Sequence, residues 1–292
     1  LKRHRRDWML RSMSPHNPPS PSRPFRIGYD ASVTLAPGGG GIRRYVLELL
    51  RAMVANAPTD AEFVVLLNSR RRAPGPDHTF LFSHPQVRVV TTRWPGPAVV
   101  EGWRLAAMPR WEWLTGVPCD VVFSPAGYIP SARCPVVATV HDLAFLRETG
   151  PLPVLGGGHF KRLYPARLRT LRRIITHSEF VRQDVAKTYD FSVDRITVAR
   201  PGLSEVFGDQ PSLRERKNHV LALTGTVARK RAAWVLRPTL GGSACRVAGV
   251  ASLAAKYPFV LPHLSDAALR DQYMGARLAV LPSAEEGFGF PV

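Results

Sequence analysis

The chain has 292 residues, enough for two domains of ordinary size, and its 45% hydrophobic and 21% charged residues are typical of a globular protein. No uncharged apolar run reaches the ~18 residues that a membrane span needs, and no apolar core with a cleavage site follows the basic N-terminus. Cys119, Cys134 and Cys245 are far apart and form no Cys-x-x-Cys pair, which argues against a disulfide framework and a zinc site. We therefore expect a cytoplasmic protein that carries no metal.

The charge is strongly positive, because 40 Lys and Arg stand against 22 Asp and Glu, which gives a net charge of +18. Such a balance suits a nucleic-acid partner. However, the basic clusters are not interleaved with aromatic residues, and no recognisable nucleic-acid motif is present. We expect no nucleic-acid partner. A phosphorylated small substrate or an anionic membrane surface accounts for the charge better, and the abundance of Arg favours a bacterial source.

The chain divides into a leader and two α/β units. Residues 1–24 are basic and then rich in Pro and Ser, a composition that predicts disorder. From residue 25, short apolar runs alternate with helical periods, which indicates an α/β fold with parallel sheets. A first domain is expected over 25–202, a linker over 203–218 and a second domain over 219–292. The expected strands are 26–33, 63–68, 87–93, 120–124, 136–141, 174–177, 196–199, 219–224 and 278–281.

Two helices have clear signals. Residues 42–54 place apolar side chains at i, i+3, i+4 and i+7, which predicts a helix with one apolar face. Ser178 is a favourable N-cap for a second helix, whose Val181 and Val185 lie on one side.

Glycines at the end of the first strand form the first of three loops that carry chemistry, since ligands of open α/β sheets bind beyond the carboxyl ends of strands. Gly38 to Gly41 precede a helix, so their backbone can approach an anion at the helix N-terminus. A dinucleotide site is not expected, because Arg43 stands where Gly-x-Gly-x-x-Gly needs its last glycine and Asn68 where an acid is needed. A flexible turn is the alternative interpretation.

The second loop begins at His141 and Asp142, which end the apolar run PVVATV. An imidazole at a strand exit can hydrogen-bond a substrate hydroxyl or move a proton near neutral pH. Asp142 is expected to serve the backbone, because neighbours in a strand point to opposite faces. A structural histidine is the alternative.

The third loop is residues 282–291, with the sequence PSAEEGFGFP after the last expected strand. Its carboxylates stand beside glycine backbone that a ligand can approach closely, and an ionised carboxylate suits the vicinal hydroxyls of a sugar. An acidic tight turn is the alternative.

Six segments in chain order resemble family 4 glycosyltransferases. The nucleotide-sugar signature of that family, PS-x-x-EGFGLP-x-x-E, is similar to PSAEEGFGFP. Its Gly-rich loop and His-Asp strand resemble GGGGIRRYVLELL and VVATVHDLAF, and the segment before its linker resembles RRIITHSEFVRQDVAKTYDFSVDRITVARPGLSEVF. Its second domain opens with a loop similar to ALTGTVARKR, and the helix and strand before the signature resemble LSDAALRDQYMGARLAVLPS. The resemblance covers residues 25–230 and 261–292.

The resemblance implies a GT-B fold, in which two Rossmann-like domains face a cleft. It implies a retaining glycosyltransferase that moves a hexose, with mannose a candidate, from a nucleotide-diphosphate sugar to a glycan or lipid-linked acceptor in polysaccharide biosynthesis. Neither a cofactor nor a metal is expected, since a basic pair does the work of the ion.

Site residues are carried over by motif. The resemblance implies that His141 faces the reacting sugar, that Glu286 holds it, and that Arg229 and Lys230 bind the donor diphosphate. The remaining implied substrate-binding residues are Gly40, Gly41, Gly287, Phe288 and Gly289.

The sequence departs from the family pattern in two places. The second glutamate of the signature corresponds to position 294, beyond Val292, so we expect an incomplete second domain. Between Lys230 and Leu261 the chain is shorter than the family pattern, and Pro238 stands where the interior of a strand is expected.

Two other functions stay open. One is a catalytically silent fragment that keeps an acceptor- or membrane-binding domain. The run 161–173 supports it, because Arg169, Arg172 and Arg173 stand near Leu168 and Leu171 as in a helix at the inner face of a membrane. A solvated helix face is the alternative. The other function is a nucleotide-sugar epimerase, which Glu286 and its signature argue against.

Overall fold

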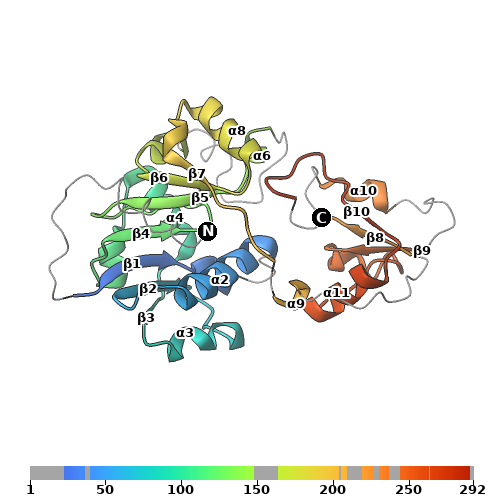
Figure 1. Cartoon of the computed structure of the whole chain (residues 1–292), viewed down its shortest axis with the longest axis horizontal. Helices are drawn as coiled ribbons and strands as arrows, with labels where there is room; N and C mark the ends of the chain where they lie inside the picture. The colour runs from blue at the N-terminus through green and yellow to red at the C-terminus, as the bar shows by residue number, and fades with distance from the viewer. Residues whose placement is uncertain are drawn as a thin grey trace, which may run out of the picture.

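The computed structural model describes residues 23–36, 40–147, 164–203, 205–208, 219–225, 230–236, 244–262 and 264–289. These residues form a larger and a smaller α/β unit, each built around a parallel sheet (Figure 1). The α/β class and the parallel sheets predicted from the sequence are confirmed.

The larger unit is a seven-stranded parallel sheet in the order β3-β2-β1-β4-β5-β6-β7. The order reverses between β1 and β4, so the carboxyl ends of the central strands border a crevice where ligands of such sheets bind. All seven strands predicted for this region form. Their bounds are β1 Phe25–Asp30, β2 Ala61–Asn68, β3 Val87–Thr92, β4 Val121–Ser124, β5 Val136–Val140, β6 Arg173–Thr176 and β7 Ile196–Val198.

The core lies on both faces of this sheet. In β2, Val64 and Leu66 belong to one buried cluster, while Phe63 and Val65 belong to another. Successive side chains of a strand point to opposite faces, so both faces of β2 are covered. This double burial explains why the strand is a continuous apolar run.

Helices pack on both faces of the larger sheet. The predicted helix over 42–54 is α2, and its Val46, Leu50 and Val54 are buried as the periodicity requires. Ser178 caps the predicted α8, because its hydroxyl accepts a hydrogen bond from the Val181 amide at 3.2 Å. The helices of this unit are α2 Gly40–Ala55, α3 Thr79–Ser83, α4 Gly96–Ala106, α5 Trp111–Thr115, α6 Ala144–Arg147 and α8 Glu179–Tyr189, with 3-10 turns η1 Ser32–Leu35, η2 Pro76–His78 and η3 Val193–Arg195.

Trp111 anchors the core at the start of α5. Its side chain is fully buried and packs against Gly28 of β1, where a Cβ atom would lie 2.9 Å from the indole ring. Gly28 therefore provides the space that the indole occupies.

The smaller unit has a three-stranded parallel sheet in the order β10-β8-β9. The predicted strands β8, His219–Leu223, and β10, Leu278–Val280, form. The sequence interpretation missed β9, Ala244–Ala248, because it tested the strand pattern around Pro238, outside the described residues. The strand begins six positions later and ends at Ala248, and the next residue, Gly249, has a φ of +95°, which a glycine adopts easily. The other elements are α9 Glu205–Gly208, α10 Ala232–Val235, η5 Ala251–Leu253 and α11 Asp266–Gly275.

The proposed leader and linker lie mostly outside the described residues. At the end of the leader, Arg23 forms an ion pair with Asp120 at 2.7 Å. Of the linker, α9 is described.

The argument for a membrane-surface helix at 161–173 is wrong. Residues 161–163 lie outside the described part, and residues 164–169 are helical. Leu168 and Leu171 are fully buried in the core of the larger unit, so they form no exposed apolar face. Nowhere in the described ranges is a helix both long and apolar enough to cross a membrane.

Candidate active site

Two histidines stand side by side at the carboxyl edge of the larger sheet. His141 follows β5 and His177 follows β6, and these strands pair in parallel with Val140 opposite Thr176. The register therefore brings the two imidazoles together. His177 Nε2 lies 2.9 Å from His141 Nδ1.

The remaining contacts of His141 fix its ring against the protein. Its Nε2 lies 2.8 Å from the carbonyl oxygen of Pro125. The ring of Tyr45, from α2, meets both imidazoles edge-on, with centroids 5.3 Å from His141 and 4.6 Å from His177. The sequence interpretation named His141 and missed His177, although both follow buried strands that are neighbours in the sheet.

The signature loop of the smaller unit docks on these histidines. The hydroxyl of Ser178 donates a hydrogen bond to the carbonyl of Gly287 at 2.6 Å. Gly287 approaches so closely that a Cβ atom there would lie 2.0 Å from the His141 carbonyl oxygen. Phe288 faces His177 with ring centroids 6.5 Å apart. The loop therefore reaches the edge of the larger sheet only with glycine at position 287.

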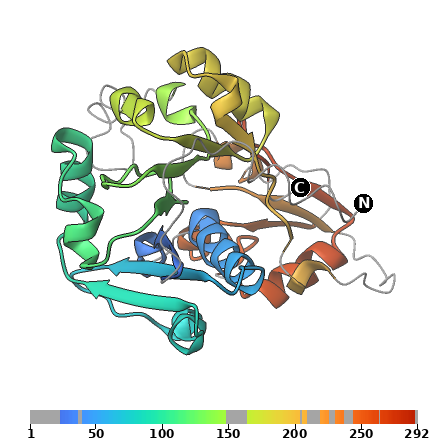
Figure 2. The same cartoon turned by 60° about the vertical axis from the view of Figure 1, so that its left-hand side comes forward.

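Two ion-pair groups join the units. Arg147 of α6 donates from Nε to Glu285 at 2.9 Å and also pairs with Asp184 of α8 at 2.9 Å. Arg44 of α2 pairs with Asp266 of α11. Figure 2 shows α2, in blue, in front of the smaller sheet. These contacts hold the signature loop beside the histidines.

Lys230 and Glu286 form an ion pair although 56 residues separate them. Lys230 follows β8 and Glu286 follows β10, and the two strands are neighbours. Their side chains are 21% and 20% exposed. The two charges predicted to bind the donor are thus in contact, whereas Arg229 lies outside the described residues.

Gly40 and Gly41 are the first two residues of α2 and have open space beside them. Gly40 has a φ of +48°, and nothing lies within 4 Å of a Cβ atom at Gly40 or Gly41. Gly38 and Gly39 lie outside the described residues. Gly289 has a φ of +77°, which again favours glycine. Open space at Gly40 and Gly41 is compatible with a ligand, and their roles stay predictions.

Burial keeps both histidines neutral. The pKa of His141 is lowered to about 4, mainly because burial removes solvent and to a smaller extent because His177 repels a positive charge there. The hydrogen bond to the Pro125 carbonyl acts in the opposite direction. Burial also lowers the pKa of His177. At neutral pH the pair is therefore an uncharged hydrogen-bonding unit.

This neutrality predicts an acid-sensitive fold. Between pH ~6.5, the ordinary histidine pKa, and pH ~4 the unfolded chain binds a proton that folded His141 does not, and the lowered pKa of His177 acts in the same direction below pH ~6.5. The pair should therefore not change the free energy of unfolding above pH ~6.5. As the pH drops below ~6.5, the free energy of unfolding should decrease by up to ~1.4 kcal/mol per pH unit for each histidine. Urea unfolding at several pH values from 7.5 to 5 measures this slope. A slope of opposite sign, or one unchanged in His177→Gln, would contradict the assignment.

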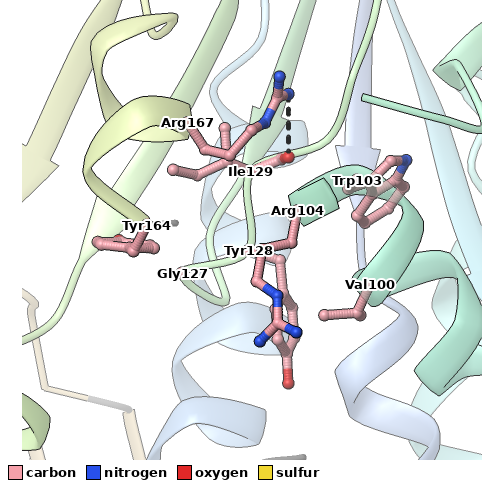
Figure 3. Close-up of a pocket in the computed structure, with 8 residues that line it drawn as sticks. All are labelled: Val100, Trp103, Arg104, Gly127, Tyr128, Ile129, Tyr164 and Arg167. Atoms are coloured by element: carbon pink, nitrogen blue, oxygen red, sulfur yellow. Dashed lines mark hydrogen bonds between the residues drawn. The ribbon is translucent and has the colours of Figure 1, made fainter. Parts of the chain in front are cut away.

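A hollow lies in the larger unit (Figure 3). It is small and partly open to solvent, and the free space of about 310 Å³ around it includes the solvent at its mouth. Gly127 connects it to the site, since a Cβ atom there would lie 3.8 Å from His141 Cδ2. The Arg167 guanidinium turns away to the carbonyls of Ile129 and Pro130, so the hollow is mainly apolar. Its lining residues are Val100, Trp103, Arg104, Gly127, Tyr128, Ile129, Tyr164 and Arg167.

Among the described residues, no group of three or more His, Cys, Asp or Glu side chains is placed to hold a metal ion. The groups gathered at the site are one ion pair, two neutral imidazoles and glycine backbone. This set can bind hydroxyls and an anion.

Comparison with known proteins identifies the class. The model of Glycosyltransferase Family 4 matches residues 39–205, more than half of the chain. The chain belongs to Glycosyltransferase Family 4, and it is a glycosyltransferase. The pair of parallel-sheet units agrees with the GT-B arrangement. No curated protein sequence gives a significant match.

Several solved structures resemble the chain at low identity. The lipopolysaccharide outer core galactosyltransferase WaaB, in its apo form, has 12% identity and a TM-score of 0.49, over 91% of this chain and 76% of WaaB. TarM has 12% identity and a TM-score of 0.42, over 59% of this chain and 38% of TarM. The wall teichoic acid polymerase TagF has 10% identity and a TM-score of 0.46, over 89% of this chain and 66% of TagF.

Proposed function

We propose that this glycosyltransferase moves a hexose from a nucleotide-diphosphate sugar with retention of anomeric configuration. The observation that supports this most is the meeting of Lys230 and Glu286 at the ends of β8 and β10, on the loop that contacts His141. An ammonium, a carboxylate and glycine backbone match the three parts of such a donor: diphosphate, sugar hydroxyls and close-packed glycosyl group.

In this proposal, donor binding exchanges the partners of the ion pair. The diphosphate takes the ammonium of Lys230, with Arg229 beside it, and the carboxylate of Glu286 accepts hydrogen bonds from sugar hydroxyls. When the glycosyl bond breaks, negative charge grows on the leaving diphosphate, and the ammonium stabilises it without a metal ion. Gly287, Phe288 and Gly289 bring backbone against the sugar.

His141 contributes as a neutral group on the acceptor side of the reacting sugar. The hollow next to Gly127 lies on the same unit, and aromatic faces such as those of Trp103 and Tyr128 suit the apolar side of a sugar ring or a lipid. We propose a glycan or lipid-linked acceptor, with mannose a candidate for the sugar moved. The net charge of +18 supports cytoplasmic action at an anionic membrane surface.

Nucleotide binding tests the donor site. Lys230→Ala should weaken binding of nucleoside diphosphates, tested as UDP, GDP, ADP and CDP by calorimetry, by roughly tenfold or more, since a hydrogen bond to a charged group contributes about 1.5–3 kcal/mol. Lys256, exposed in the same unit and stacked on Tyr257, supplies the matched control, and Lys256→Ala should change affinity less than about twofold.

Glu286→Gln separates the two roles within the pair. Without the carboxylate, Lys230 is released for the diphosphate, so nucleoside diphosphates should bind as well as or better than to the wild type. The matching nucleotide sugar should bind more weakly, because an amide accepts fewer hydrogen bonds from hydroxyls. Equal losses for both ligands would show that Glu286 does not hold the sugar.

A further inference from the structure

His177 takes part in three contacts that its position in the chain does not explain by itself. Its Nε2 faces His141 at 2.9 Å, its Nδ1 lies 3.4 Å from the Ala199 carbonyl, and its ring packs near Phe288 of the signature loop. The side chain is 5% exposed. An imidazole that only filled space in the core would not need these polar partners.

Counting protons assigns the tautomers. The two rings make three hydrogen-bonding contacts, to the carbonyls of Pro125 and Ala199 and to each other, but two neutral imidazoles carry only two N–H protons. A proton on His177 Nδ1 would leave one of the two shorter contacts without a donor: either His141 Nε2 would be bare, 2.8 Å from the Pro125 oxygen, or two bare nitrogens would face each other 2.9 Å apart between the rings. In the favourable neutral arrangement, the longest contact, from His177 Nδ1 to the Ala199 carbonyl at 3.4 Å, therefore has no proton. In it, His141 donates from Nε2 to Pro125, and His177 donates from Nε2 to His141.

The bare Nδ1 of His177 sets how the pair is protonated. A third proton placed there completes all three contacts, whereas a proton on His141 has no free nitrogen to occupy. Tyr45 from α2 packs against both rings, Asp142 follows His141 in the chain, and the signature loop that contacts His141 carries Glu286, which is paired with Lys230.

We propose that His177 is a positioning residue, which holds His141 as its Nε2–H tautomer and thereby fixes the surface on which the signature loop docks. The chain of contacts runs from His177 to the His141 ring, and from the His141 carbonyl to Gly287. His177 also contacts Phe288 directly. The consequence for donor binding rests on the proposed function, because it takes the signature loop as the donor site.

Substitution at His177 separates positioning from packing. In His177→Gln the side-chain amide can still donate toward His141 Nδ1, whereas His177→Leu keeps an apolar volume and removes the donor. His78 is the matched control, since it is a buried histidine hydrogen-bonded to Thr34 at 2.8 Å, away from the site.

Nitrogen-15 NMR of labelled histidines reads the tautomer directly. We expect the Nε2–H pattern for His141 in the wild type, in His177→Gln and in His78→Gln, and a mixed pattern in His177→Leu. Nucleotide-sugar affinity should fall about tenfold or more in His177→Leu and recover in His177→Gln. An unchanged His141 pattern in His177→Leu would overturn the positioning role.

The wild-type chain gives a second readout that needs no variant to fold. On acidification, the first proton should appear on His177 Nδ1, with the His141 signals shifting in concert. A first proton on His141 would overturn the proposal. If the tautomers follow expectation but no nucleotide sugar binds to the wild type, the proposed function fails while the positioning role stands.

Discussion

Gly287→Ala is expected to lower glycosyl transfer by roughly 100-fold or more. The added Cβ atom would lie 2.0 Å from the His141 carbonyl oxygen, a backbone atom that cannot rotate away, so the signature loop must withdraw from the larger unit. A displacement of about 1 Å in a reacting group can cost 10²-fold in rate. Release of nucleoside diphosphate from the nucleotide sugar measures the change.

The control for Gly287→Ala is Gly75→Ala. Gly75 has a negative φ, and nothing lies within 4 Å of its added Cβ atom, so transfer should stay within about twofold of the wild type. Thermal unfolding of both variants checks that the larger unit is intact. Wild-type rates in Gly287→Ala would show that the docking of the loop on His141 is not used in catalysis.

Trp111→Ala should reduce the free energy of unfolding by about 3–5 kcal/mol, the range for removing a large aromatic side chain from a core. Trp111 is fully buried against Gly28 and belongs to the same buried cluster as Val122, and both of these residues are on central strands that cannot collapse into the space. Urea unfolding monitored by circular dichroism measures the loss. The denaturant midpoint should fall accordingly.

Trp113 provides the comparison, because it lies two residues further along the same helix and is 60% exposed. Trp113→Ala should change the free energy of unfolding by no more than about 0.5 kcal/mol. Similar losses in the two variants would mean that α5 is stabilised by something other than the burial of Trp111.

The sequence predicted the central strands of the larger sheet most clearly, because strands such as β2 are buried on both faces. Double burial makes a strand such as β2 an apolar run that stands out between polar loops. The exception, β9, contains Cys245 and Arg246, and Arg246 reaches outward to Gln272 at 2.8 Å. A short strand with a charged residue in its middle carries no comparable signal.

The candidate site could be predicted only in part. Motifs named His141, Lys230 and Glu286, and the structure brings the last two into contact. The pairing of His141 with His177 depends on the register of β5 and β6, which a single sequence does not specify. Likewise, no local pattern links Arg147 to Glu285, since they are 138 residues apart and meet through the packing of two units.

The central claim is that this chain transfers a sugar with retention, and proton NMR of the products tests it most directly. The chain is incubated with UDP-, GDP- and ADP-hexoses and a high concentration of methanol as surrogate acceptor. A methyl glycoside, unlike a free sugar, does not interconvert between anomers in water, so its configuration records the outcome of the transfer. We predict that one donor gives a methyl glycoside with the donor's own configuration, and that Lys230→Ala abolishes it. An inverted glycoside, or no sugar released from any donor, would contradict the account.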